Sequence, residues 1–121
     1  MDVRVKTFTA EAVGRLGALL DQQGFVGPEV EHEQGSHPLV IRVSYHRADV
    51  SVETCLVLAY AGEEYVQTVL RWHPRHADTP QQAEAGFNTA HTGYQMRRAL
   101  DRHVETVREA LRITQTGDPD T

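Results

Sequence analysis

The chain has 121 residues, of which 40% are hydrophobic, and a formal net charge of −5 at neutral pH. A chain of this size forms one domain and buries enough surface to fold without crosslinks. The negative charge argues against a DNA- or RNA-binding domain, because such a domain needs a basic surface to neutralise phosphates. The single cysteine excludes an internal disulfide, and no apolar run is long enough to span a membrane.

The first residues also lack the basic and apolar segments of a secretory leader, so we expect a cytoplasmic protein that does not associate with membranes. We expect a single α+β domain at residues 1–113. The polar residues 114–121 have the composition of a flexible tail.

The first predicted element is an amphipathic helix that begins after Thr9 and ends at Gly24. Thr9 can cap the helix, and Val13, Leu16 and Leu20 form an apolar stripe. Glycine at the end supplies the left-handed conformation that terminates many helices. Before this helix, hydrophobic and charged residues alternate at residues 3–6, which allows a short extra strand.

Between residues 26 and 73 the hydrophobic period changes to two, which is typical of half-buried strands. Four runs appear, at residues 26–33, 38–46, 50–60 and 64–73. The breaks between them are short enough for hairpins, so the sequence predicts a four-stranded antiparallel meander. Matching faces across the hairpins pairs Val30 with Ile41, Val43 with Val52, and Leu58 with Val66.

This register gives the predicted sheet two different faces. The face assigned to the core carries Val30, Leu39, Ile41, Val43, Val52, Leu56, Leu58, Val66, Leu70 and Trp72. The opposite face carries a row of alternating charge, Glu29, Arg42, Glu53 and Arg71. Opposite charges across strands favour one register more than they add stability. Trp72 is expected to be buried against a helix.

Residues 79–82, Thr-Pro-Gln-Gln, have the capping pattern of a helix start, and Gly86 and Gly93 predict a break near residues 86–93. A long amphipathic helix then follows from about residue 94 to 113. Both helices have one apolar stripe and the sheet has one apolar face. The sequence therefore predicts an α+β two-layer sandwich with both helices on one sheet face.

Seven histidines raise the question of a metal site. His73 and His76 are the closest pair, but Pro74 separates them at the end of a strand, where the two rings are not aimed at one point. Ser44, Ser51 and His73 share the outer face, but an open sheet supplies neither an orienting acid nor an oxyanion hole. We therefore expect no metal, no cofactor and no catalytic residue.

The second sheet face is unusually apolar for a solvated surface, because Val40, Cys55, Val57, Ala59, Tyr65 and Val69 group toward one end. Such a patch, rimmed by charge, is typical of a partner site, unless the first residues, residues 80–93 or the tail cover it. We expect a partner-binding surface formed by Val40, Arg42, Glu53, Cys55, Val57, Tyr65, Val69 and Arg71. This predicts a small non-enzymatic protein-binding protein, such as an adaptor, a chaperone or a toxin inhibitor of the immunity type, acting as a homodimer or with another protein.

The alternative is a small enzyme or ligand-binding protein. Its pocket would lie between the sheet and the C-terminal helix, lined by His32, Trp72, His91 and Tyr94. A closed pocket with convergent polar groups would favour this alternative, whereas a filled core would favour the binding protein.

Overall fold

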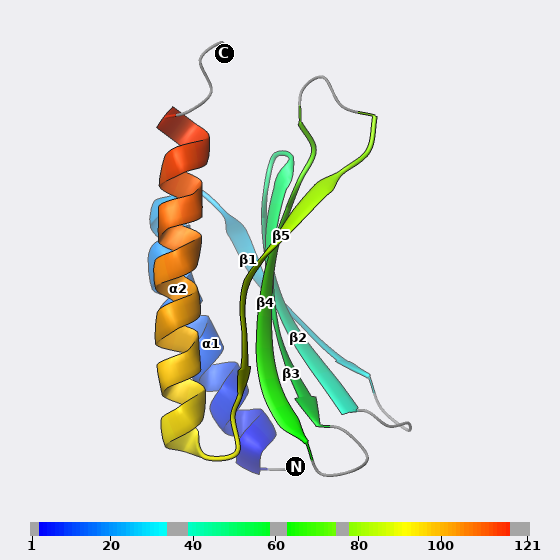
Figure 1. Cartoon of the computed structure of the whole chain (residues 1–121), viewed down its shortest axis with the longest axis vertical. Helices are drawn as coiled ribbons and strands as arrows, with labels where there is room; N and C mark the ends of the chain where they lie inside the picture. Colours follow the sequence, from blue (N-terminus) through cyan, green and yellow to red (C-terminus); the bar gives the residue numbers. More distant parts are fainter. Residues whose placement is uncertain (1–2, 34–38, 59–62, 75–77, 117–121) are drawn as a thin grey trace.

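The computed structural model describes residues 3–33, 39–58, 63–74 and 78–116. The elements in chain order are α1 (Val3–Gln22), β1 (Val26–Glu33), β2 (Leu39–Arg47), β3 (Val50–Leu58), β4 (Glu64–Trp72), β5 (Gln81–Thr89) and α2 (Gly93–Thr116). The strands form one antiparallel sheet in sequence order (Figure 1).

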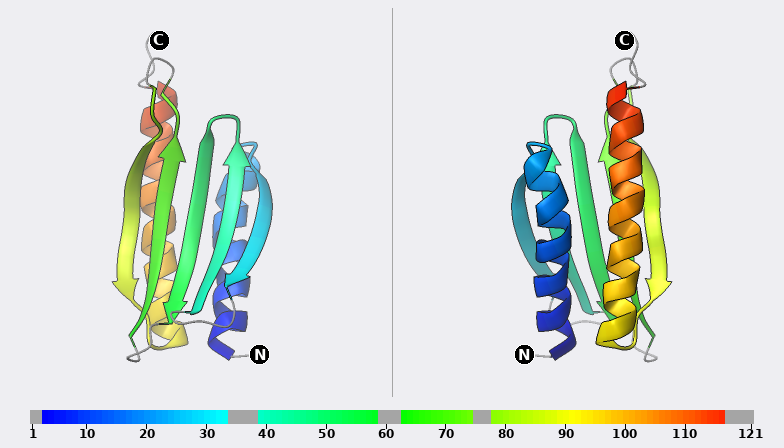
Figure 2. Two further views of the ribbon diagram at one scale, coloured as in Figure 1. Left: turned by 90° about the vertical axis from the view of Figure 1, so that its right-hand side faces the viewer. Right: turned by 90° about the vertical axis from the view of Figure 1, so that its left-hand side faces the viewer.

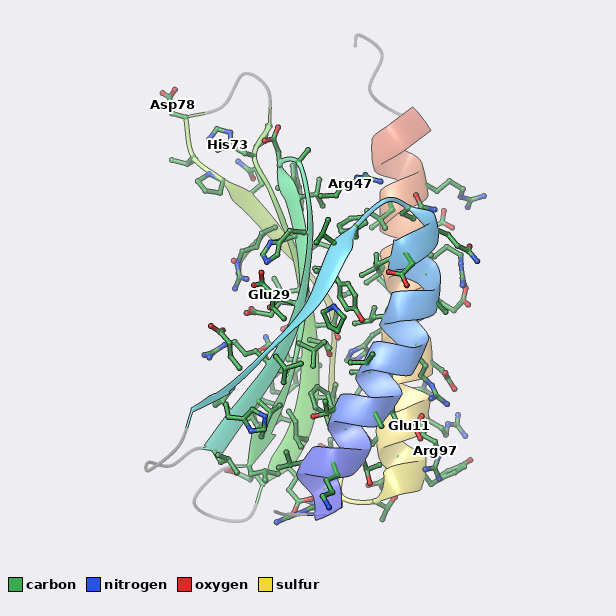
Figure 3. The ribbon with its side chains drawn as sticks, turned by 180° about the vertical axis from the view of Figure 1, so that it is seen from behind. Glu11, Glu29, Arg47, His73, Asp78 and Arg97 are labelled. Carbon is green, nitrogen blue, oxygen red and sulfur yellow. The ribbon has the colours of Figure 1, made fainter. Side chains whose placement is uncertain are left out.

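Both helices pack on the same face of the sheet, so the predicted two-layer α+β arrangement is confirmed (Figure 2). Helix α1 lies against β1, β2 and β3, and α2 lies against β4 and β5. The two helices also contact each other. Arg15 of α1 donates to Asp101 of α2 at 2.6 Å, and Glu11 and Arg97 lie beside each other at 3.8 Å (Figure 3). Within the described part of the chain, no helix is both long and apolar enough to cross a membrane.

The sheet has five strands in the described residues, so the prediction of four strands and of a helix start at residue 79 is wrong. Residues 81–89 instead form β5, which pairs along the whole length of β4. Gly86, Asn88 and Thr89 are poor helix formers, whereas a strand here satisfies the backbone groups that β4 would otherwise leave unpaired. The local capping signal is therefore overridden by pairing with a neighbour.

Helix α1 begins at Val3, so the expected cap at Thr9 and the short strand before it are also wrong. Helical spacing places Val5 and Phe8 on the same stripe as Ala12 and Leu16, and all four are buried. The roughly two added turns bury two more large side chains, Val5 and Phe8, which favours a helix over an isolated strand.

The strand register differs from the prediction by two residues at the first three hairpins. Val30 lies opposite Val43, Val43 opposite Thr54, and Leu58 opposite Glu64. A slip of two keeps every side chain on its face, so hydrophobic alternation alone does not distinguish the two registers. At the turn between β2 and β3 the loop decides the register, because Ala48 adopts a positive φ of 46° next to the closing pair Arg47–Val50.

The core lies between the helices and the inner face of the sheet, the face assigned to it by the sequence. Seven of the ten predicted core residues are buried: Ile41, Val43, Val52, Leu56, Leu58, Val66 and Leu70. Leu39 and Trp72 are only half-buried at its margin, and Val30 is 40% exposed on the edge strand. Trp72 is therefore not the buried anchor that was predicted. Tyr45 is the largest fully buried side chain, and Gly17 of α1 leaves space for its hydroxyl.

Candidate protein-binding face

The outer face of the sheet, the face turned away from both helices, is covered by no described element (Figures 1 and 2). Strand pairing arranges its side chains in rows across β2, β3, β4 and β5. The first row is Val40, Val57, Tyr65 and Thr89, and the second is Arg42, Cys55, Gln67 and Phe87. The third row is Ser44, Glu53, Val69 and Glu84. The first row is largely apolar, the second is half polar because it contains Arg42 and Gln67, and the third is polar except for Val69.

All eight residues predicted to form the partner surface lie on this outer face. Val57 and Val69 are only 8% exposed, because neighbouring side chains shield them, and Val40, Cys55 and Tyr65 are half-buried. Ala59 lies outside the described residues. The most exposed apolar group of these three rows is Phe87 of β5, which is 52% exposed and stacks on Tyr65 with ring centroids 4.4 Å apart.

Sequence reasoning missed Phe87 because it assigned residues 79–93 to a helix and a break. The strand alternation in this segment is weak, because Gly86 interrupts it and a bulge opposite Thr68 and Val69 shifts the register. Aromatic side chains with exposed rings are common energetic anchors of protein interfaces. The Tyr65–Phe87 pair is therefore the strongest feature of the outer face.

At the polar end of the outer face, two arginine side chains pair with one glutamate carboxylate. Arg71 donates to Glu53 at 2.9 Å, and Arg42 lies 3.7 Å from the other oxygen of the same carboxylate. Glu29 does not continue this row as predicted, because it lies opposite Ser44, and its carboxylate lies 3.4 Å from Nε2 of His46. These charges form a rim next to the apolar side chains.

Ser51 and His73 come together as the sequence predicted, whereas Ser44 is not among the residues that line their hollow. The hollow has a volume of about 250 Å³, and its wall also includes His46, Arg71 and Trp72. The His73 ring lies 3.2 Å from the carbonyl of its neighbour Pro74, and its backbone N–H donates to the carbonyl of Asp49. His76 lies outside the described residues. Among those that the structure does describe, no three His, Cys, Asp or Glu side chains are grouped to hold a metal.

The four residues proposed for a pocket do not come together. His32 is exposed on the edge strand β1, and Trp72 is at the last position of β4. His91 lies 3.7 Å from Glu64, the first residue of β4, so about 25 Å of strand separates it from Trp72. Tyr94 is 61% exposed on α2. The layer where this pocket was expected contains buried side chains of the core cluster.

A chain of buried hydrogen bonds lies in that layer instead. Thr54 and Thr68 are fully buried with their hydroxyls 2.8 Å apart, and the Thr68 hydroxyl lies 2.7 Å from Nδ1 of His103. Nε2 of His103 lies 2.8 Å from Oδ1 of Asn88. Nε2–H therefore donates to Asn88, Thr68 donates to Nδ1, and Thr54 donates to Thr68.

His103 is 1% exposed, and burial lowers its pKa to about 4, against a smaller opposing effect of Glu84. The imidazole is therefore neutral at physiological pH, with both nitrogens hydrogen-bonded. This arrangement is a satisfied core histidine. Two features of the sequence could have indicated this hydrogen-bond chain: two threonines on the core face of the sheet, and a histidine on the apolar stripe of the last helix.

Comparison of the chain with protein-family models, with curated proteins and with solved structures finds no match. The outer face of the sheet is the most extensive candidate site in the described residues.

Proposed function

We propose that this is a non-enzymatic protein-binding protein that associates with a second copy of itself through the outer face of the sheet. The observation that carries the proposal is the stacked pair Tyr65–Phe87, with Phe87 half-exposed on the edge strand β5 of a face that no described element covers. We also propose a cytoplasmic location, where a single cysteine such as Cys55 stays reduced.

The size of the outer face supports a dimer. Strands of eight or nine residues are about 30 Å long, and five strands at a spacing of about 4.8 Å make a face about 24 Å wide. Each copy can therefore contribute about 700 Å² of surface to an interface, and two copies together can bury about 1,400 Å². Specific interfaces bury about 1,200–2,000 Å² in total, so this face has the extent that a stable dimer needs.

The charges on the outer face support a second copy as the partner. The face carries both Arg42 and Arg71 and the carboxylates of Glu29, Glu53 and Glu84. A face with charges of both signs can pair with its own copy, whereas a face of a single sign would repel it. The ion pairs around Glu53 already hold these side chains in place, which lowers the entropy lost on association.

Sedimentation of the wild type and of Phe87→Arg tests this proposal. The wild type should sediment as a dimer, and Phe87→Arg should raise the dissociation constant of the dimer at least about tenfold, because it places a charge at an apolar anchor. The fold should survive, because the Phe87 side chain points away from the core. The matched control is Tyr94→Arg, which replaces another exposed aromatic residue in the helix layer and should leave the dimer unchanged.

A wild type that stays monomeric at high protein concentration would overturn the proposal. Equal weakening by Phe87→Arg and Tyr94→Arg would also overturn it, because the effect would then not be specific to the outer face.

A further inference from the structure

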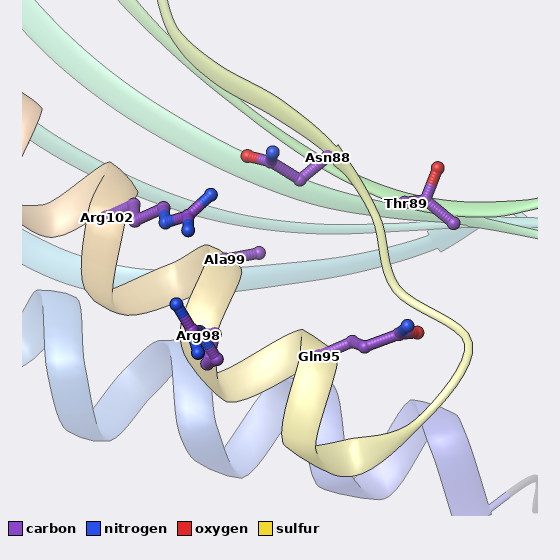
Figure 4. Close-up of a pocket in the computed structure, with 6 residues that line it drawn as sticks. All are labelled: Asn88, Thr89, Gln95, Arg98, Ala99 and Arg102. Carbon is purple, nitrogen blue, oxygen red and sulfur yellow. The ribbon is translucent and has the colours of Figure 1, made fainter.

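A second site lies between the edge strand β5 and helix α2, and of the three outer-face rows it includes only Thr89. Its cavity has a volume of about 150 Å³ and is lined by Asn88, Thr89, Gln95, Arg98, Ala99 and Arg102 (Figure 4). Two of these residues come from β5 and four from the first turns of α2. Arg98 and Arg102 are one turn of helix apart. Ala99 lies between them, and its small side chain leaves the cavity open (Figure 4).

The side-chain amide oxygens of Asn88 and Gln95 both accept hydrogen bonds from other groups of the protein. Oδ1 of Asn88 accepts from Nε2–H of His103 at 2.8 Å, and Oε1 of Gln95 accepts from the backbone N–H of His91 at 2.8 Å. The NH₂ group of Asn88 is therefore the end left to donate a hydrogen bond toward α2, whereas the Gln95 amide is turned toward the loop before α2 (Figure 4). The buried hydrogen-bond chain behind Asn88 holds this orientation.

The cavity is also positively charged. The guanidinium of Arg98 contacts only a neutral partner among the described residues, the phenol of Tyr94 at 3.0 Å. The Arg102 guanidinium has no carboxylate partner in the described part of the chain. The acids nearest in sequence are engaged elsewhere, since Asp101 accepts from Arg15 and Glu105 from Arg108. No carboxylate lines the cavity.

We propose that this cavity binds an oxyanion, the carboxylate or phosphate group of a small molecule. Two guanidinium groups and the amide NH₂ group of Asn88 provide hydrogen-bond donors, and charge-assisted bonds from arginine to an oxyanion are the strongest of these. The hollow of about 150 Å³ is open to solvent, so it can take the oxyanion group while the rest of the molecule stays outside. A chain with a net charge of −5 does not attract anions in general, so binding depends on this local arrangement.

The test is an NMR titration of the whole chain with inorganic phosphate and, separately, with acetate. Sodium chloride at matched ionic strength is the reference for screening. Binding should shift the side-chain signals of Asn88, Gln95, Arg98 and Arg102 saturably. Tighter binding of phosphate assigns the site to phosphorylated ligands, and tighter binding of acetate assigns it to carboxylates.

Two variants and a control make the test specific. Arg102→Met should weaken binding at least about tenfold, because it removes a charge-assisted donor. Asn88→Asp keeps the acceptor for His103 but replaces the NH₂ donor with a negative oxygen, so it should abolish binding while the fold remains. Arg112→Met, on the same helix but outside the cavity, should bind as the wild type does, because it leaves Glu105 paired with Arg108.

Shifts that chloride reproduces, the absence of saturable shifts with either anion, or equal binding by all three variants would overturn the oxyanion site. The dimer-breaking variant Phe87→Arg should still bind the anion, so the two proposals fail independently.

Discussion

Gly86 of β5 lies directly against the imidazole of His103, so close that a methyl group on residue 86 would be 2.1 Å from the ring carbon Cδ2. The ring cannot move away without breaking a hydrogen bond, because Thr68 holds one of its nitrogens and Asn88 the other. Glycine is therefore required here for close packing, although it weakens a strand.

We predict that Gly86→Ala lowers the free energy of unfolding by about 1–3 kcal/mol, the usual cost of overpacking a filled core. Urea unfolding of the purified variant measures this change. Gly14→Ala in α1 is the control, because a methyl group there meets no atom within 4 Å. This control should gain about 0.5–1 kcal/mol, since alanine is the better helix former. A Gly86→Ala variant as stable as the wild type would contradict the packing of His103 against β5.

The pH dependence of stability follows from the low pKa of His103. The unfolded chain protonates this imidazole below its ordinary pKa of about 6.5, whereas the folded protein does so only near pH 4. The unfolded state therefore binds more protons as the pH falls through this window, and stability is lost there. Between about pH 7 and pH 5 the loss from this one group should be about 2 kcal/mol.

Urea unfolding at both pH values, for the wild type and for the non-titrating variant His103→Gln, isolates this contribution from that of the carboxylates. The variant should lose less stability on acidification than the wild type. Titration of His103 in the folded protein with a pKa near 6.5, followed by NMR, would show that the ring is not buried as described.

The order of the hydrogen-bond chain predicts unequal effects for its two threonines. Thr68→Val removes the donor to His103 and the acceptor for Thr54, and each group left unsatisfied costs about 1–3 kcal/mol. Thr54→Val removes only the terminal donor and should cost about 1 kcal/mol. Valine has nearly the same shape as threonine, so the difference between the two unfolding free energies reports the hydrogen bonds. Equal costs would contradict Thr68 as the central link.

Hydrophobic periodicity in the sequence was enough to predict most of the layers. Alternation with a period of two assigned residues such as Ile41 and Leu56 to the inner face and Cys55 to the outer face, because a strand turns successive side chains to opposite sides. The stripe of the last helix and the short breaks between strands predicted a helix packed on an antiparallel meander. These features depend only on each residue's neighbours along the chain, which is why the sequence alone determined them.

Only the tertiary structure decided the features that depend on a partner distant in sequence. Residues 79–82 have a local helix-start signal, but pairing with the free edge of β4 makes residues 81–89 a strand and exposes Phe87 on the outer face. Slipping a hairpin by two residues preserves every face, so turn geometry had to select the register. His103 is neutral because the sheet and α2 together exclude water from it. Asn88, the acceptor that orients it, lies on β5, in the segment where the sequence predicted a break in a helix.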